Sequence, residues 1–178
     1  MTSYLGKARK KLQLDIGFGD IIVPKPKKLS YPSLLNLDAP DVNVYSLESV
    51  IAEKFEAMLK LGRINSRMKD FYDLYTISRL HTFDGRVLQE AVYETIQRRG
   101  TALKEEAIVF TEKFINNKER SQMWSTYLKR INIEYISFFE VMKSLEKFLS
   151  PIYEAIIEEK ELLKRWDNEE SSWKKYND

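Results

Sequence analysis

Three side chains with a spacing suited to phosphate chemistry lie in the middle of the chain. Lys54 falls within an apolar stripe at positions 47, 50, 51 and 58, which have helical spacing. Asp70 and Asp73 follow three residues apart, so a helix places both carboxylates on one face. A buried lysine needs a charged partner or a polar ligand. We therefore predict that Asp70 pairs with or orients Lys54 and leaves a cation ready for phosphate.

Each of these residues also has a purely structural interpretation. Lys54 can lie at the edge of the stripe and extend its ammonium group into solvent. Asp70 and Asp73 can be carboxylates in the first turn of a helix, where they favour the helix dipole. The residue types alone leave both alternatives open.

A further carboxylate, Asp15, lies in an alternating segment. Apolar residues alternate with polar residues and glycines over residues 11–20, which predicts a strand with one buried face. Asp15 then points to the opposite face, and Gly17 and Gly19 permit a bulge or the close approach of a ligand. Residues 21–23 are β-branched and predict a second short strand or an extension of the first.

The composition excludes several kinds of chemistry. The 178 residues contain no cysteine, which rules out disulfides, thiolate-bound metals and thiol catalysis. His81 is the single histidine, so a metal site with several histidines is impossible within one chain, and we assign His81 no catalytic role. The 29 Lys and Arg against 27 Asp and Glu are too balanced to argue for nucleic acid by themselves. Any chemistry must therefore use carboxylates, lysine, arginine, hydroxyls or the backbone.

The elements that must position these residues are mostly helices. Apolar spacing predicts helices over residues 46–62, 67–80, 87–100, 103–116 and 118–131, and a last helical stretch from 136 to 163 that Pro151 kinks or splits. Four prolines, at 24, 26, 32 and 40, predict an extended loop over residues 24–45. The predicted fold class is α+β and mostly α, with one or two N-terminal strands packed on a bundle of about six helices.

The predicted organisation has three parts. Residues 1–45 form the strand and extended-loop segment, residues 46–166 form the helical domain, and residues 167–178 form a polar tail that is either frayed or a docking segment. The apolar runs are far shorter than the roughly 20 residues of a membrane helix, and no secretory signal is visible. We therefore expect a cytoplasmic protein without membrane association.

Three blocks of the sequence resemble one protein family. Residues 14–20 (LDIGFGD), 45–58 (YSLESVIAEKFEAM) and 65–75 (NSRMKDFYDLY) resemble the AbiEii/AbiGii toxin-type nucleotidyltransferases of type IV toxin–antitoxin and abortive-infection systems. Residues 98–101 (RRGT) and the helical tail look like the continuation, so the resemblance covers roughly residues 5–150. The blocks are long, ordered and correctly spaced.

The resemblance implies a nucleotidyltransferase fold related to DNA polymerase β, with a helical C-terminal half. It implies transfer of a nucleotide from an NTP, with Mg²⁺, to an acceptor that is tRNA in some members, and a cognate antitoxin as partner. The implied catalytic residues are Asp15, which would bind metal, Lys54 and Asp70. The implied nucleotide- and phosphate-binding residues are Lys54, Arg67, Lys69 and Asp73.

The chain departs from the family pattern in one respect. The family's first motif, Gly-Gly or Gly-Ser followed about ten residues later by Asp-x-Asp, occurs nowhere in these 178 residues. We therefore expect the chain to be the C-terminal portion of such an enzyme, with the first two strands a remnant of its sheet. Asp15 would be an incomplete metal site. We expect the chain alone to hold neither Mg²⁺ nor NTP as a cofactor and to be inactive or nearly so.

The alternative is a non-catalytic helical interaction module that binds an antitoxin, itself or RNA. Residues 1–28 hold seven basic and two acidic side chains, and Arg63, Arg67, Arg98 and Arg99 add further cations. Strands taken from a larger sheet would leave unpaired edges, so a homodimer through these edges is a reasonable expectation.

Overall fold

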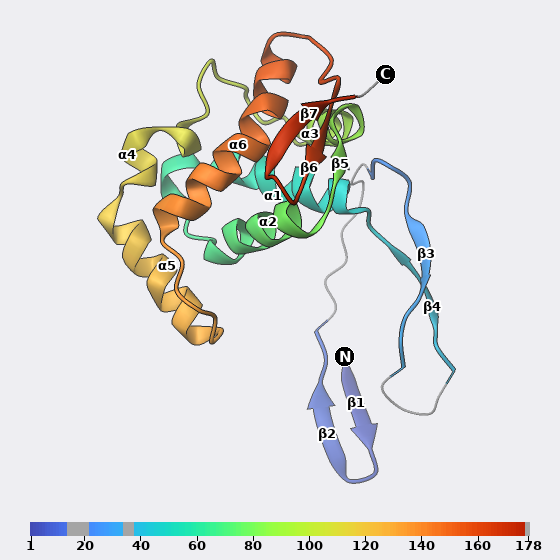
Figure 1. The fold of residues 1–178 in the computed structure, drawn as a ribbon. Helices are drawn as coiled ribbons and strands as arrows, with labels where there is room; N and C mark the ends of the chain where they lie inside the picture. Colours follow the sequence, from blue (N-terminus) through green and yellow to red (C-terminus); the bar gives the residue numbers. More distant parts are fainter. Residues whose placement is uncertain (14–21, 34–37, 177–178) are drawn as a thin grey trace.

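The computed structural model describes residues 1–13, 22–33 and 38–176 of the chain. These residues form a helical body with small antiparallel sheets toward both termini (Figure 1). The six α-helices of the described residues are α1 (Leu47–Leu61), α2 (Met68–Leu80), α3 (Gly85–Arg99), α4 (Glu112–Ile115), α5 (Lys118–Arg130) and α6 (Phe138–Ile157), with short 3-10 turns η1 (Gly62–Ile64) and η2 (Ile108–Phe110). The α+β, mostly helical fold class is therefore confirmed.

Helix α1 begins and ends where the sequence predicts. The Ser46 hydroxyl accepts a hydrogen bond from the backbone N–H of Ser49, which caps the first turn. Gly62 ends the helix with a φ of 46°, a conformation that glycine adopts at little cost. Helices α2, α3 and α5 also agree with their predicted ranges to within two residues.

Helix α6 lies at the centre of the hydrophobic core. Its buried apolar residues pack against α2, α3 and α5. Phe138 meets Phe71 of α2 edge to face, with ring centroids 5.5 Å apart, and contacts Trp124 of α5. The helix continues through Pro151 to Ile157, so the proline does not split it.

The predicted helix over residues 103–116 is largely wrong. Only η2 and the single turn of α4 are helical there, and residues 101–104 have no regular structure. The Tyr153 hydroxyl of α6 accepts a hydrogen bond from the N–H of Lys104 and donates one to its carbonyl. This side chain therefore satisfies the backbone groups that a helix would otherwise pair.

Two exposed hairpins precede the helical body. The strands β1 (Thr2–Leu5) and β2 (Ala8–Lys11) form the first, and β3 (Lys27–Ser30) and β4 (Asp41–Val44) form the second. Figure 1 shows both hairpins projecting away from the helices. All residues of β2 and β3 are exposed, so these strands are not packed on the bundle as predicted.

The predicted strands and loop of this region need correction where the structure describes them. The strand predicted over residues 11–20 lies almost entirely outside the described residues, and residues 22–23 are not a strand. The extended loop predicted over residues 24–45 contains β3 and β4 instead. The four prolines flank these strands rather than interrupt them, so each four-residue strand fits between them.

A three-stranded sheet closes the C-terminal side of the body. The strands β5 (Phe83–Asp84), β6 (Lys164–Asp167) and β7 (Ser172–Lys175) pair antiparallel in that order. Trp173 of β7 stacks on Phe148 of α6 and donates its ring N–H to the Phe148 carbonyl at 3.0 Å. Of the two alternatives for the polar tail, residues 172–175 agree with the docking segment.

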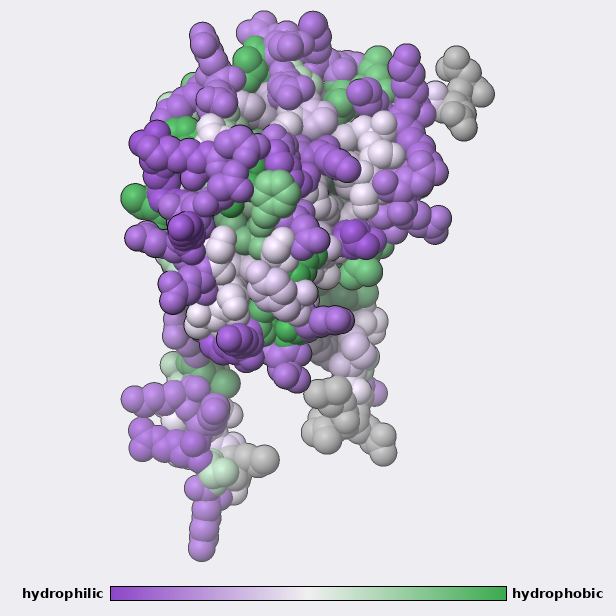
Figure 2. Space-filling model, turned by 60° about the vertical axis from the view of Figure 1, so that its left-hand side comes forward, coloured by the Kyte–Doolittle hydropathy of each residue, from purple (hydrophilic) through white to green (hydrophobic). Residues whose placement is uncertain are grey.

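The described residues contain no membrane-spanning helix, and the visible surface of the helical body is mostly hydrophilic. Among the residues that the structure describes, no helix has both the length and the apolar character to span a bilayer. In Figure 2, hydrophilic side chains cover most of the visible face of the helical body, and hydrophobic ones lie in small separate areas.

Candidate functional site

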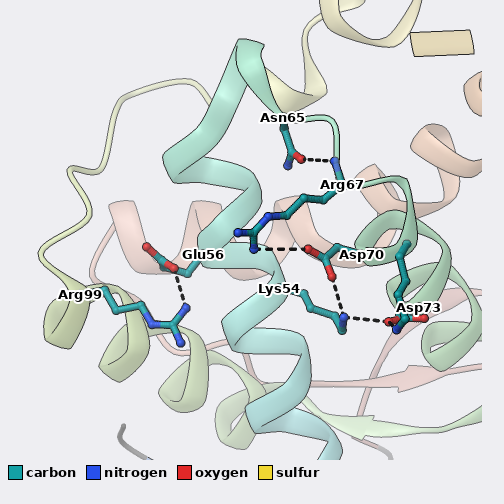
Figure 3. A network of polar contacts seen from close by, with 8 residues as sticks. Lys54, Glu56, Asn65, Arg67, Asp70, Asp73 and Arg99 are labelled. Atoms are coloured by element: carbon teal, nitrogen blue, oxygen red, sulfur yellow. Dashed lines mark hydrogen bonds and ion pairs between the residues drawn. The ribbon is translucent and has the colours of Figure 1, made fainter. Parts of the chain in front are cut away.

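Helices α1 and α2 position the three residues that the sequence singled out. The turn between the helices is fixed by Asn65, whose side-chain oxygen accepts a hydrogen bond from the backbone N–H of Arg67 at 2.9 Å. This turn brings the first part of α2 beside the middle of α1. Lys54 on α1 and the two aspartates of α2 consequently face one another (Figure 3).

The Lys54 ammonium lies between two carboxylates. Its Nζ is 2.7 Å from Oδ1 of Asp70 and 2.8 Å from Oδ2 of Asp73. The three side chains are only 19%, 16% and 22% exposed, respectively. Lys54 therefore does not extend freely into solvent, and the predicted pairing with Asp70 is present.

Two more cations flank the carboxylates on the outer side. Lys69 Nζ lies 2.5 Å from Oδ2 of Asp73, and Arg67 Nη1 lies 3.9 Å from Oδ2 of Asp70. Their side chains are 70% and 63% exposed. We call Lys54, Arg67, Lys69, Asp70 and Asp73 the Lys54 cluster. It holds three cations and two carboxylates, so it carries a net positive charge.

Mutual attraction keeps the cluster ionised. Burial alone would lower the pKa of Lys54, but hydrogen bonds and charge from Asp70 and Asp73 outweigh it, and the pKa lies above the usual lysine value. Burial alone would raise the pKa of Asp73, but the ammonium groups of Lys54 and Lys69 hold it below the usual aspartate value. Both groups are therefore charged at neutral pH.

The cluster does not have the donor set of a divalent-cation site. The space between Asp70 and Asp73 holds the Lys54 ammonium, so these carboxylates are already neutralised. Within the described ranges, no group of three or more Asp, Glu or His side chains is placed to hold a metal ion. Asp15, the predicted metal ligand, lies outside the described residues.

A groove of about 810 Å³ runs alongside the cluster, between the start of α2 and the face of α5. Arg67, Lys69 and Asp70 line its α2 side, and Tyr127 and Arg130 line its α5 side. No pattern in the sequence marks the α5 residues as part of a site. They are more than fifty positions from Asp70 in the chain, and only the packing of α5 beside α2 brings them to the groove.

A second polar centre fixes residues 98–101, which the sequence singled out. The Glu56 carboxylate of α1 is almost fully buried, and it accepts a hydrogen bond from Nη1 of Arg99 at 3.0 Å (Figure 3). The Thr101 hydroxyl also donates to Glu56. This centre therefore joins α1 to the end of α3.

Comparison with known proteins identifies one family. The model of the family described as nucleotidyl transferase AbiEii toxin of the type IV toxin–antitoxin (TA) system matches residues 1–150. No curated protein sequence and no solved structure matches the chain. The family match spans most of the 178 residues and includes the Lys54 cluster and the Glu56 centre. The chain therefore belongs to the AbiEii family of nucleotidyltransferase toxins of type IV toxin–antitoxin systems.

Proposed function

We propose that the helical body supplies the phosphate-facing part of a nucleotidyltransferase that transfers a nucleotide from an NTP to an acceptor such as tRNA. The observation that carries this proposal is the Lys54 cluster, in which two exposed cations lie at the edge of a groove and an inner lysine fixes the carboxylates between them. The family membership supports the reaction type. A cognate antitoxin follows from the same membership.

The exposure of each side chain in the cluster indicates its proposed role. Arg67 and Lys69 are exposed and line the groove, so they are placed to contact phosphate oxygens. Lys54 already donates to two carboxylates, and contact with a triphosphate would require it to leave one of them. We therefore assign Lys54 the positioning of Asp70 and Asp73. The triphosphate contact that the resemblance implies is its second proposed role.

We further propose that this chain alone transfers little or no nucleotide. The Gly-Gly or Gly-Ser turn and the Asp-x-Asp pair are absent from all 178 residues. The carboxylates of the Lys54 cluster are already paired with Lys54, so they are poor substitutes for the missing ligands. Asp15 remains the proposed metal ligand of the intact site.

A labelled-nucleotide assay tests the inactivity. The purified chain is incubated with each of the four radiolabelled NTPs, Mg²⁺ and total tRNA, and the RNA is separated on a denaturing gel. We expect no label above that of a reaction without protein. Mg²⁺-dependent label in tRNA would contradict the proposal.

A binding assay tests the phosphate-facing role separately. Inorganic triphosphate probes the phosphate contacts without the missing metal site that the NTP–Mg²⁺ complex would need. Its binding to the full chain is measured by calorimetry for the wild type and for the double variant Arg67→Gln, Lys69→Gln. We expect the affinity to fall by at least about tenfold, because two charge-assisted contacts are removed. Lys60→Gln, at an exposed position on α1, is the control and should bind as the wild type does. Equal affinity of the double variant would rule out this role.

The exposed hairpins favour a second candidate, a non-catalytic module that associates with itself. Strands β1 to β4 form two-stranded sheets whose outer edges have no strand neighbour among the described residues. Leu29 and Tyr31 are large apolar side chains that are 48% and 57% exposed. Such edges are templates for pairing with another chain, and RNA binding through the basic N-terminal run is the further alternative.

Sedimentation at increasing protein concentration tests this candidate. We expect a dimer for the wild type and a shift toward monomer for the double variant Leu29→Lys, Tyr31→Lys, because added charge blunts a strand edge. The control Lys60→Gln should sediment as the wild type does. A monomer at high concentration would count against self-association.

A further inference from the structure

A second, smaller pocket lies at the other side of the η1 turn. It has a volume of about 330 Å³ and lies between η1, η2 and the start of α5. The residues that matter for its chemistry are Asn65, Lys113, Phe114, Glu119 and Arg120. It is distinct from the groove beside the Lys54 cluster, although Ser66, Glu119 and Met123 line both.

Two buried donors of this pocket have no hydrogen-bond partner. They are Nδ2 of Asn65 and Nε of Arg120, and these residues are only 3% and 9% exposed. Leaving a buried donor unpaired costs about 1–3 kcal/mol, and native proteins rarely keep such groups without a reason. Both donors belong to residues that line the same small pocket, so one ligand with acceptor oxygens could satisfy both.

The Arg120 side chain is held in place before any ligand arrives. Its guanidinium lies over the Phe114 ring, 3.9 Å from the ring centroid. Its Nη2 donates to the backbone carbonyl of Arg63. Stacking fixes the plane of the group and the hydrogen bond fixes its rotation, so Arg120 is held in one orientation. Nε itself has less than 1 Å² of accessible surface, so a ligand reaches it only after a small shift of the pocket lining.

The charge of the pocket favours an anion. Burial lowers the pKa of Arg120, with Glu119 opposing the shift through space, but an arginine remains protonated at neutral pH. Among the described residues no carboxylate forms an ion pair with Arg120. Arg63 and Lys113 add two exposed cations to the lining, against the single carboxylate of Glu119. The positive end of the α5 dipole also lies here, since Asn117 caps that helix and lines the pocket.

We propose that this pocket binds a phosphate group of a nucleotide or of an RNA backbone through Asn65 and Arg120. A guanidinium edge matches the geometry of phosphate oxygens, and the Asn65 amide supplies a neutral donor beside it. The shared residues with the groove would let one nucleotide chain reach both sites. The proposal that the pocket binds phosphate depends only on the residues of the pocket. The proposal that this phosphate belongs to a nucleotide or an RNA depends on the proposed function.

Titration of the full chain with inorganic phosphate, followed by calorimetry at low ionic strength, tests the pocket. The variant Asn65→Asp keeps the oxygen that accepts from Arg67 and replaces the free donor with an anionic oxygen. We expect it to weaken phosphate binding by at least about tenfold. Arg120→Lys keeps the charge but loses the planar fork, and it should weaken binding by several-fold. Lys129→Gln removes an exposed cation of α5 that does not line the pocket, and it should bind phosphate as the wild type does.

Competition experiments then distinguish the sources of phosphate. Displacement of bound phosphate by an NTP assigns the pocket to a triphosphate, and displacement by a short single-stranded RNA without triphosphate assigns it to the RNA backbone. Failure of both competitors overturns the assignment to a nucleotide or RNA. Absence of phosphate binding, or equal binding by wild type and Asn65→Asp, overturns the site. None of these measurements requires nucleotide transfer, so they remain decisive even when the transfer proposal fails.

Discussion

The ammonium of Lys54 on α1 lies 2.7 Å from a carboxylate oxygen of Asp70 on α2, 16 positions further along the chain. Asp73, one helical turn later, holds the same ammonium at 2.8 Å. This link is ionic, yet it joins helices that both contribute apolar residues to the core, such as Ile51 of α1 and Leu74 of α2. The pair of aspartates therefore serves both the packing of α2 on α1 and the electrostatics of the adjoining groove.

Removing the central cation should destabilise the fold. Lys54→Met keeps most of the side-chain volume but leaves Asp70 and Asp73 mostly buried without their shared partner. We expect the free energy of unfolding to fall by about 1–3 kcal/mol, as for a hydrogen-bonded charge that is partly screened by solvent. Urea denaturation measures it, with the exposed Lys60→Met on the same helix as control. Equal losses in the two variants would show that the ionic link contributes nothing of its own.

The cluster should also make stability depend on acid pH. The pKa of Asp73 is lower in the folded than in the unfolded chain, so its contribution is complete above the unfolded value and is lost as the pH falls through the folded value. We expect the free energy of unfolding to decline below about pH 4. Asp73→Asn should flatten this decline, whereas the exposed Asp38→Asn should leave it unchanged. Denaturation curves over a pH series measure both, and parallel curves for wild type and Asp73→Asn would contradict the prediction.

At alkaline pH the contribution of the same cluster to stability should fall as the pH rises. The pKa of Lys54 is raised in the folded chain, so its contribution is complete below the unfolded value and is lost as the pH rises through the folded value. We expect Lys54→Met to lose its stability deficit relative to wild type above the usual lysine pKa of 10.5. The same denaturation curves, extended to alkaline pH, measure this convergence. A deficit that stays constant across that range would contradict it.

The spacing of apolar residues correctly predicts the helices whose ends are marked in the sequence by capping residues. Ser46 and Gly62 bound α1, and the pattern of apolar residues between them predicts both the helix and the exceptional position of Lys54. The helix predicted over residues 103–116 is largely absent, because the apolar residues of this segment pack without a helical backbone. Tyr153, on the distant helix α6, bonds the backbone N–H and carbonyl of Lys104 in place of helical partners. Local pattern contains no information on such a partner.

Some residues of both sites could not be predicted from the sequence because only tertiary packing brings them there. Tyr127 and Arg130 join the groove because α5 packs beside α2. Arg120 joins the second pocket because the start of α5 lies beside η1 and η2. The polar tail was ambiguous because a four-residue strand with two lysines has little apolar pattern. Trp173 is informative because it is partly buried against Phe148, which fits a docked rather than a frayed segment.

The buried Glu56 should be more important for stability than any exposed carboxylate of α1. Glu56→Ala removes the acceptor of Arg99 and Thr101, so we expect the free energy of unfolding to fall by about 2–3 kcal/mol. Glu53 also faces Arg99, but at 3.8 Å and with a side chain that is 32% exposed. Glu53→Ala is therefore the matched control and should lose less than about 1 kcal/mol. Chemical denaturation of both variants tests the ranking, and the reverse order would refute it.

The contact between α3 and the C-terminal sheet should depend on the absence of a side chain at Gly85. A Cβ atom there would lie 2.5 Å from the carbonyl oxygen of Leu162 and 2.6 Å from that of Lys164. Both oxygens belong to the backbone, and the next residue, Arg165, is paired with Asp84 in the sheet. The two oxygens therefore cannot move away from a Cβ atom unless β6 moves with them. Alanine normally stabilises a helix relative to glycine, but here we expect Gly85→Ala to lower the free energy of unfolding by about 1–3 kcal/mol.

Denaturation followed by tryptophan fluorescence measures this loss, since displacement of β6 also disturbs Trp166. The exposed Glu90→Ala on the same helix is the control and should stay within about 0.5 kcal/mol of the wild type. If Gly85→Ala proved as stable as the wild type, β6 would have to shift without losing its contacts. The close approach of α3 to residues 162–164 would then not constrain the sheet. A stable variant with unchanged tryptophan fluorescence, to which Trp166 contributes together with Trp124 and Trp173, would be the clearest evidence against the predicted constraint.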